Sequence, residues 1–355
     1  MSADPEDLRP QKRLRTAEDS PSQSSTTTIA SGNLNDLKRH EEFWFDDGSV
    51  VLIARNTGFR VFRSLLAAQS TIFSDMLSSS SPTAEEMFEG CPVVHVSDSP
   101  EDVAHFLHVL LPKSQRTLYA RNPRISFRKL SAIIRLAHKY HVQDVLDQAI
   151  AALEEYFTSD FDIWERGANL GAVAFNPKHA IGVVNLARLV DRPSLLPLAF
   201  YQCVSLGGEV VNGYRREDGS MECLDISDIK RCIDGRNELA AKAAGFISDV
   251  FVMHPCARCE TPGDCPSALK KILETVICSE DASSSDVLAS WEEPIKLWAA
   301  DFLLCRPCTN ATIGREAAKR KRVWNALPDI FDIEVDGWHS GGGDGVNSAA
   351  TTPTA

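Results

Sequence analysis

Beyond a polar N-terminal arm, the apolar positions of the chain change from the spacing of strands to the spacing of helices. Apolar runs at 43–45 and 50–53 flank Asp47-Gly48, a pair of residues that favours a tight turn, so the segment predicts a β-hairpin. A further strand that begins at Gly58 runs directly into a helical period. The apolar stripe of that period predicts two short helices and consists of Leu65, Leu66, Ile72, Phe73, Met76 and Leu77.

A second alternation of strand and helix follows. The apolar run at 92–96 is typical of a strand. Pro100 beside Glu101 suits the first turn of a helix, because backbone N–H groups have no partner within the helix there and a negative charge is favoured. Helical spacing then extends over 127–140 and 142–157. Periodicity alone therefore predicts a mixed domain in which helices pack on a small sheet.

This order of elements, together with three segments of the chain, resembles the BTB/POZ domain. The segments read DGSVVLIA, FRVFRSLLAAQSTIFSDML and CPVVHVSDSPEDVAHFLHVLL, and the resemblance covers 41–157. More narrowly, the chain is similar to the BTB proteins of mushroom-forming (basidiomycete) fungi. The resemblance implies a protein-interaction module that often forms homodimers and carries no catalytic chemistry.

The chain after this domain is predicted to be helical. Apolar stripes at helical spacing run through 158–253, where Pro193 and Gly207-Gly208 act as start and stop signals. The last part of this region predicts a short helix over 228–233 and a long one over 237–253. We therefore expect an all-α region after the α+β BTB/POZ domain.

A small cysteine-rich helical module is predicted over 254–335. The two ends of the chain, 1–40 and 336–355, are rich in small and polar residues. They bury too little apolar surface to offset the entropy of ordering, so we expect a disordered arm and a disordered tail.

Two C-x-x-C pairs, Cys256/Cys259 and Cys305/Cys308, give this module its chemistry. Each pair places two sulfurs on one side of a turn, and two such turns brought together form a four-thiolate cage suited to structural Zn²⁺. Cys265 and Cys278 lie between the pairs, so the ligand set stays open. Inert buried thiols and a redox pair are the alternatives. A redox pair needs an exposed thiolate of low pKa in a βαβ setting, whereas helical patterns flank both pairs.

Zinc held by four thiolates is formally a dianion, which favours cations nearby. Arg258 and Arg306 lie inside the two turns, and the basic run at 319–322 follows Cys308 on a predicted helix. The run is interpreted either as a source of compensating charge or as a solvated helix face.

Composition limits the classes of protein. The formal net charge of the 355 residues is −12, which argues against a broad nucleic-acid surface because phosphate binding needs concentrated Lys and Arg. The chain has a polar N-terminus and no apolar run long enough for a membrane span, so we expect an intracellular protein, cytoplasmic, nuclear or both. Lys12-Arg13-Leu14-Arg15 is either a short nuclear-import signal or a solvated charge cluster.

These features predict a non-enzymatic scaffold. Met87-Phe88-Glu89 resembles the hydrophobic-x-Glu element of cullin-binding BTB domains, so Met87 and Glu89 are candidate partner-binding residues of a cullin-3 ubiquitin-ligase substrate adaptor. The alternative is a nuclear transcriptional cofactor that recruits corepressors through a BTB dimer. A thiol redox enzyme that uses Cys256 and Cys259 is a third, outlying hypothesis. The sequence contains no nucleotide-binding loop, serine-hydrolase elbow or H-E-x-x-H motif.

Overall fold

The structure, a computed structural model, describes residues 34–78, 86–111, 125–167, 173–278 and 286–338. Residues 1–37 and 38–355 are separate units, and the helices, strands and sites below belong to the second, apart from a single 3-10 turn, η1 (Leu34–Asp36). Within the described ranges no helix is both long and apolar enough to cross a lipid bilayer. The basic run at Lys12-Arg13-Leu14-Arg15 lies outside the described residues.

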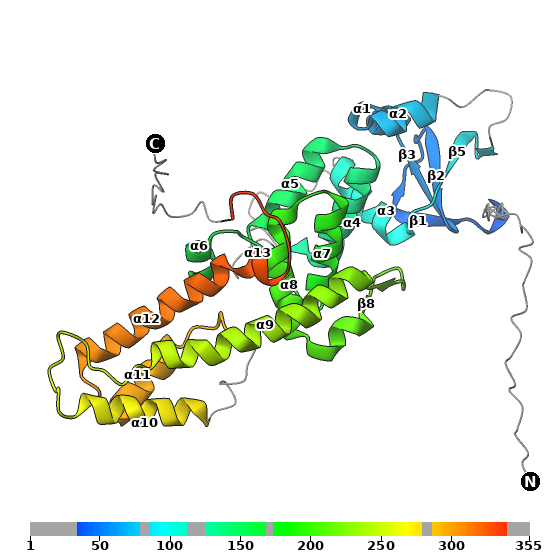
Figure 1. Ribbon diagram of the computed structural model, residues 1–355. Helices are drawn as coiled ribbons and strands as arrows, with labels where there is room; N and C mark the ends of the chain where they lie inside the picture. Colours follow the sequence, from blue (N-terminus) through cyan, green and yellow to red (C-terminus); the bar gives the residue numbers. More distant parts are fainter. Residues whose placement is uncertain (1–33, 79–85, 112–124, 168–172, 279–285, 339–355) are drawn as a thin grey trace, which may run out of the picture. The chain divides into compact units, whose positions relative to one another are not determined.

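A five-stranded mixed sheet forms the centre of the N-terminal domain (Figure 1). Its strands lie in the order β1-β3-β2-β5-β4, and β2 pairs antiparallel with β3 and parallel with β5. Every residue of β2 is buried, because both faces of this strand are covered, and this explains its unbroken apolar run. The strands are β1 (Lys38–Trp44), β2 (Val50–Ala54), β3 (Thr57–Val61), β4 (Met87–Phe88) and β5 (Cys91–Val96).

The hairpin expected around Asp47-Gly48 is wrong. In the described sheet β1 pairs in parallel with β3, and the hairpin is formed by β2 and β3, which turn at Arg55-Asn56. Arg55 has a positive φ of 54°, a conformation that turn signals normally assign to glycine or asparagine. The turn at Gly48 instead brings the backbone close to Arg60, whose Cγ would lie 2.8 Å from a Cβ at position 48.

Five helices of the N-terminal domain pack with this sheet into one apolar core, which continues into the helices that follow. The third begins as its sequence predicts, with Pro100 in the first turn and Ser99 Oγ accepting the backbone N–H of Asp102. β1 already begins at Lys38, so the expected disordered arm over 1–40 extends too far, because the Lys38 N–H donates to the Asn56 carbonyl. The helices are α1 (Arg63–Gln69), α2 (Thr71–Ser78), α3 (Pro100–Leu110), α4 (Phe127–Lys139) and α5 (Gln143–Glu154).

The region after α5 is helical, with short strand pairs that periodicity did not predict. One pair joins β6 (Ile125–Ser126) to β7 (Val173–Ala174) in parallel, and the other joins β8 (Tyr214–Arg215) to β9 (Met221–Glu222) as a hairpin. The helices of this region are α6 (Phe161–Glu165), α7 (His179–Leu189), η3 (Pro193–Leu195), α8 (Leu196–Ser205), η4 (Gly207–Asn212) and α9 (Ile226–Val250).

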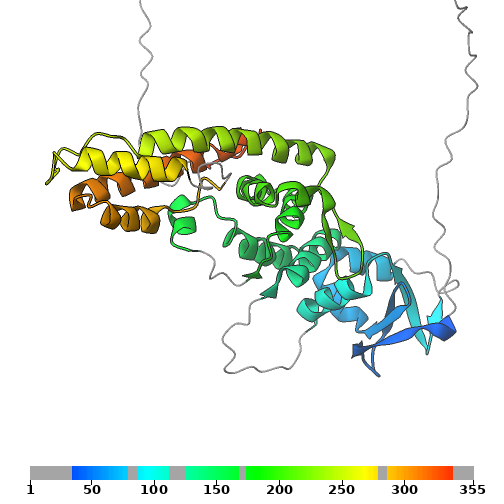
Figure 2. The same ribbon diagram turned by 90° about the horizontal axis from the view of Figure 1, so that it is seen from below.

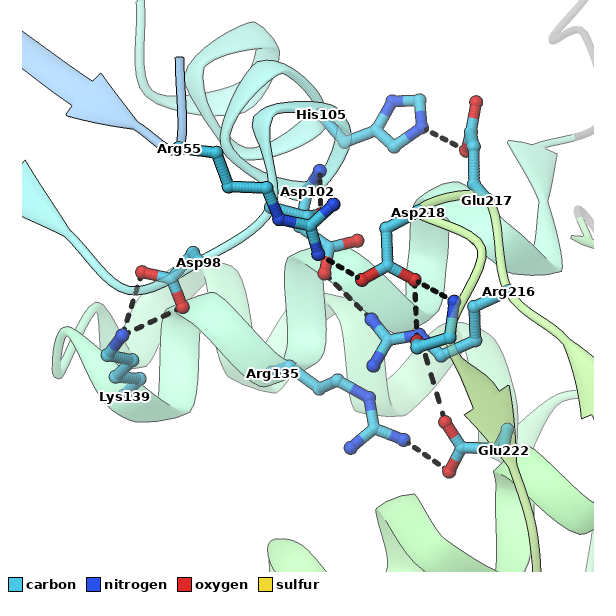
Figure 3. A network of polar contacts seen from close by, with 12 residues as sticks. Arg55, Asp98, Asp102, His105, Arg135, Lys139, Arg216, Glu217, Asp218 and Glu222 are labelled. Atoms are coloured by element: carbon cyan, nitrogen blue, oxygen red, sulfur yellow. Dashed lines mark hydrogen bonds and ion pairs between the residues drawn. The ribbon is translucent and has the colours of Figure 1, made fainter. Parts of the chain in front are cut away.

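The β8–β9 hairpin carries charged residues onto the N-terminal domain (Figure 3). Arg216 Nη2 lies 2.7 Å from Asp102 Oδ2 on α3, and Arg135 Nη2 of α4 lies 2.8 Å from Oε1 of Glu222, whose side chain is buried. Burial raises the pKa of Asp102, although Arg216 opposes this effect. Across the same junction Arg55 pairs with Asp218 at 3.0 Å, and His105 Nε2 lies within hydrogen-bond distance of Glu217 Oε2, at 2.9 Å.

The two helices expected over 228–233 and 237–253 are wrong, because the structure has one continuous helix, α9. Gly235, at the expected break, lies inside this helix and is buried. A Cβ at this position would lie 2.4 Å from Cε1 of Phe331, a ring that also stacks on Phe200. The glycine therefore permits close packing and does not end the helix.

Gly235→Ala is expected to lower the free energy of unfolding by about 1–3 kcal/mol, because the added methyl group overpacks a filled core against Phe331. Gly245→Ala is the matched control in the same helix. Its Cβ would meet nothing within 4 Å, so this substitution is expected to raise stability by up to about 1 kcal/mol. Urea denaturation of both variants measures the difference, and equal effects would contradict the packing described here.

The C-terminal helices α10 (Cys265–Ile277), α11 (Glu292–Asp301) and α12 (Arg306–Asn325) lie beside the second half of α9 (Figures 1 and 2). They enclose a second apolar core with the end of α9. The last part of α12 and α13 (Leu327–Ile330) belong instead to the first core. Trp338 is buried and stacks on Trp324, so the expected disordered tail from 336 begins too early.

Candidate metal centre and docking edge

Four cysteine sulfurs converge in the second core. The Sγ atoms of Cys259, Cys265, Cys305 and Cys308 lie within 4.8 Å of one another. Cys259 ends a turn in which its N–H donates to the Cys256 carbonyl at 3.0 Å. Cys265 is the first residue of α10, Cys305 is the N-cap of α12, and Cys308 lies in the first turn of α12. The cluster thus joins two stretches that are distant in sequence, the turn that leads into α10 and the start of α12.

The structure brings together both C-x-x-C pairs and adds a fifth thiol. Cys256 Sγ lies 3.7 Å from Cys308 Sγ, and the Cys256 N–H donates to the same sulfur at 3.4 Å. Cys265, which the spacing left open, belongs to the quartet of mutually close sulfurs. Cys278 follows the last residue of α10 and is exposed.

The distances suit a metal ion. A Zn–S bond of about 2.3 Å gives a tetrahedron whose edges are about 3.8 Å. The Sγ atoms of Cys259 and Cys305 lie 3.8 Å apart. Cys265 and Cys308 are fully or almost fully buried, as expected for a closed structural site and not for an open catalytic one. The cluster can therefore hold a metal ion.

The electrostatics of the cluster point the same way. Burial alone raises the pKa of Cys305, but the backbone N–H groups of Glu260 and Cys308 donate to its sulfur and lower that pKa to about 6. The pKa values of Cys259 and Cys308 are raised, first by burial and then by neighbouring thiols. One thiolate thus forms readily while its neighbours resist ionisation, and a divalent cation would remove that resistance.

The basic run at 319–322 does not serve the cluster. Lys319 pairs with Asp249 on α9, and Lys321 Nζ lies 3.3 Å from Asp162 Oδ1 on α6. Arg320 is 3% exposed at its side chain, and its Nε lies 2.6 Å from Glu316 Oε1. Arg320 therefore neither supplies charge to the thiols nor lies on a solvated helix face, because its side chain is buried in an ion pair with Glu316.

One cation that lies close to the thiols is Arg315, which spacing did not identify. Its Nε donates to the Val250 carbonyl at 2.9 Å, and the guanidinium is within electrostatic reach of Cys308 and Cys256. Burial lowers its pKa, whereas negative charge on these sulfurs would raise it. Arg315 lies about two helical turns beyond Cys308 on α12, so a search for runs of basic residues does not find it.

The candidate docking element lies at the edge of the sheet. Met87 and Phe88 form β4, where Met87 is opposite Pro92 of β5 and is 52% exposed. The Phe88 ring contacts Trp44 edge to face, with ring centroids 6.0 Å apart. Met87 is therefore accessible at the edge of the sheet, while Phe88 packs against Trp44.

Glu89 is held more firmly than the three-residue pattern suggests. It follows β4 with a positive φ of 49°. Its carboxylate pairs with Arg39 of β1, and Oε2 lies 3.8 Å from Arg60 Nη1 of β3. The side chain thus fixes the end of β4. A partner that contacts the Glu89 carboxylate would have to bind it beside these two arginines.

Comparison with known families identifies one domain. Residues 34–156 match the family model described as the BTB/POZ domain, the range that contains the five-stranded sheet and helices α1 to α5. No curated protein matches the chain. The narrower similarity to BTB proteins of basidiomycete fungi remains a prediction from the sequence.

Proposed function

We propose that this chain is a non-enzymatic scaffold whose BTB/POZ domain docks on one protein while the helical and cysteine-rich parts hold another. BTB/POZ domains are protein-interaction modules, and the match at 34–156 is the observation that carries the proposal. The more specific role that we propose is a substrate adaptor of a cullin-3 ubiquitin ligase. The exposed Met87 on an edge strand, next to the fixed Glu89, supports it.

Met87→Ala is expected to weaken capture of cullin-3 by about tenfold or more, because exposed apolar anchors at an interface carry a large share of the binding free energy. Val109→Ala is a matched control, since Val109 is another exposed apolar residue of the same domain, 41% exposed on α3. A pull-down of cullin-3 with the full chain measures both. No co-purification with the unsubstituted chain would remove the adaptor role.

Glu89 needs a separate design, because its carboxylate also pairs with Arg39. Loss of cullin-3 on Glu89→Ala but not on Arg39→Ala would indicate a direct contact with the partner. Equal loss in both variants would indicate that Glu89 acts by holding β4. Homodimerisation through the BTB/POZ domain and a role as a nuclear cofactor remain predictions from the resemblance and from Lys12-Arg13-Leu14-Arg15.

We also propose that the metal is a structural Zn²⁺ held by Cys259, Cys265, Cys305 and Cys308. The mutual proximity of these sulfurs supports this set. In this assignment Cys256 is an outer residue that donates its N–H to the Cys308 thiolate, an interaction that orients a ligand. The set predicted from spacing contains Cys256 in place of Cys265, so the two sets differ at one position.

A further inference from the structure

A hollow of about 540 Å³ lies where the two C-x-x-C turns meet. One wall comes from the segment between α9 and α10, and the other comes from the first turns of α12. The residues that line it are Cys256, Ala257, Arg258, Glu260, Arg306, Pro307, Asn310 and Ala311.

Two arginines give this hollow its charge. Arg258 and Arg306 are exposed, and neither has an ion pair or other polar partner among the described residues. The basic residues farther along α12 differ, because Lys319, Arg320 and Lys321 all pair with acids. In a chain with a formal net charge of −12, two adjacent unpaired guanidinium groups form a local positive surface.

The cysteine cluster has a different cation beside it, so it does not neutralise Arg258 and Arg306. Arg315 is the cation that lies half-buried near Cys308. The start of α12 is also occupied, because the Cys308 N–H donates to the Cys305 sulfur and the Thr309 N–H donates to the Cys305 carbonyl at 3.0 Å. An anion in the hollow would therefore be held by the two guanidinium groups and not by the end of the helix.

We propose that this hollow binds an acidic segment of a protein partner, with Arg258 and Arg306 each pairing with one anionic side chain. A guanidinium group matches the planar fork of a carboxylate and also the oxygens of a phosphorylated side chain. Asn310 on the same wall can donate to or accept from the backbone of the segment. Glu260 lies beside the arginines and repels a continuous polyanion, which favours separated acidic side chains over a nucleic-acid backbone.

A metal ion bound by the cysteine cluster would hold the two walls of the hollow in place before binding. Rigid presentation of paired groups lowers the entropy cost of association. The inference deepens the proposed scaffold function, since it names the kind of partner that the cysteine-rich part recognises.

Fluorescence polarisation with the full, metal-loaded chain tests this surface. The probes are a labelled peptide with separated glutamates, the same peptide with glutamines, and the same peptide with phosphoserines. We expect the glutamate peptide to bind, the glutamine peptide not to bind, and the affinity to fall as salt screens the charges. The phosphoserine arm shows which of the two anionic groups is preferred.

Arg258→Ala and Arg306→Ala are each expected to weaken binding of the preferred peptide by about tenfold, as for the loss of a charge-assisted contact. Arg322→Ala is the matched control, an exposed arginine in the last turn of the same helix, and it is expected to leave binding unchanged. Metal content, measured in parallel, shows that the cluster is intact in every variant.

Three results would overturn the proposal: no binding by either anionic peptide, equal binding by the glutamine peptide, or tighter binding by a single-stranded oligonucleotide of equal charge. Cullin-3 capture is expected to be unaffected by Arg258→Ala, because that contact lies on the BTB/POZ domain. Failure of this surface is therefore distinguishable from failure of the adaptor role.

Discussion

Cys265→Ser is expected to strip the metal from the cysteine cluster and to unfold the segment around α10, whereas Cys256→Ser leaves the metal in place. Cys265 is fully buried and belongs to the quartet of mutually close sulfurs, while the contacts of Cys256 lie at Cys308. Structural zinc contributes its binding free energy directly to folding, about 10–16 kcal/mol in zinc-finger peptides. We therefore expect this loss to exceed the effect of single substitutions outside the quartet.

Metal analysis of protein purified without chelator measures the first result, and thermal unfolding with and without chelator measures the second. Cys278→Ser is the control, since Cys278 is exposed and lies at the far end of α10. Metal loss in Cys256→Ser but not in Cys265→Ser would establish the set predicted from spacing. Less than about half an equivalent of zinc in the unsubstituted chain would contradict the site altogether.

Spacing predicted a thiol cluster from Cys256, Cys259, Cys305 and Cys308, but it did not identify Cys265 as a member of the quartet of close sulfurs. A C-x-x-C turn is a local feature, so both turns are visible in the sequence. Cys265 enters the site because it begins α10, and its position depends on how that helix packs against α9 and α12. That packing depends on the whole core, and the spacing between cysteines in the sequence gives no information about it.

The same limit explains which parts of the fold the sequence predicted. Most elements of the BTB/POZ domain follow from local periodicity, and the start of α3 was readable from Pro100 and Glu101. The partner of β1 was not readable, because strand pairing is non-local. The absence of a break between 233 and 237 was not readable either, because Gly235 packs inside α9 against Phe331, which lies far along the chain.

One missed element did carry a signal. Asp218-Gly219 separates β8 from β9, and Gly219 has a φ of 83°. An Asp-Gly pair between two short segments is a hairpin signal. It was passed over because each strand is two residues long, too short for an alternating pattern, and because helical stripes surround it. The hairpin is held instead by its ion pairs to the BTB/POZ domain, such as Arg216 with Asp102.

Arg320→Met is expected to lower the free energy of unfolding by about 3–5 kcal/mol, because it leaves a buried carboxylate without its counter-charge. Glu316 is 0% exposed, and its Oε1 accepts from both Arg320 Nε and the Trp291 N–H. Its other oxygen, Oε2, is buried and has no hydrogen-bond partner among the described residues. Arg320 also pairs with Glu165 on α6, so the substitution weakens the joint between α12 and the rest of the chain.

Two variants separate the loss of charge balance from the loss of packing. Lys321 lies next to Arg320 on α12 and forms a solvent-exposed ion pair with Asp162 of α6. Lys321→Met removes this pair and is expected to lower the free energy of unfolding by at most about 1 kcal/mol. The double variant Arg320→Met with Glu316→Leu removes both charges and is expected to recover most of the lost stability, because an apolar pair of similar volume replaces a buried ion pair. Urea denaturation of the three variants decides the matter. If Arg320→Met costs no more than Lys321→Met, or if the double variant is no more stable than Arg320→Met, the buried charge does not control the stability of this joint.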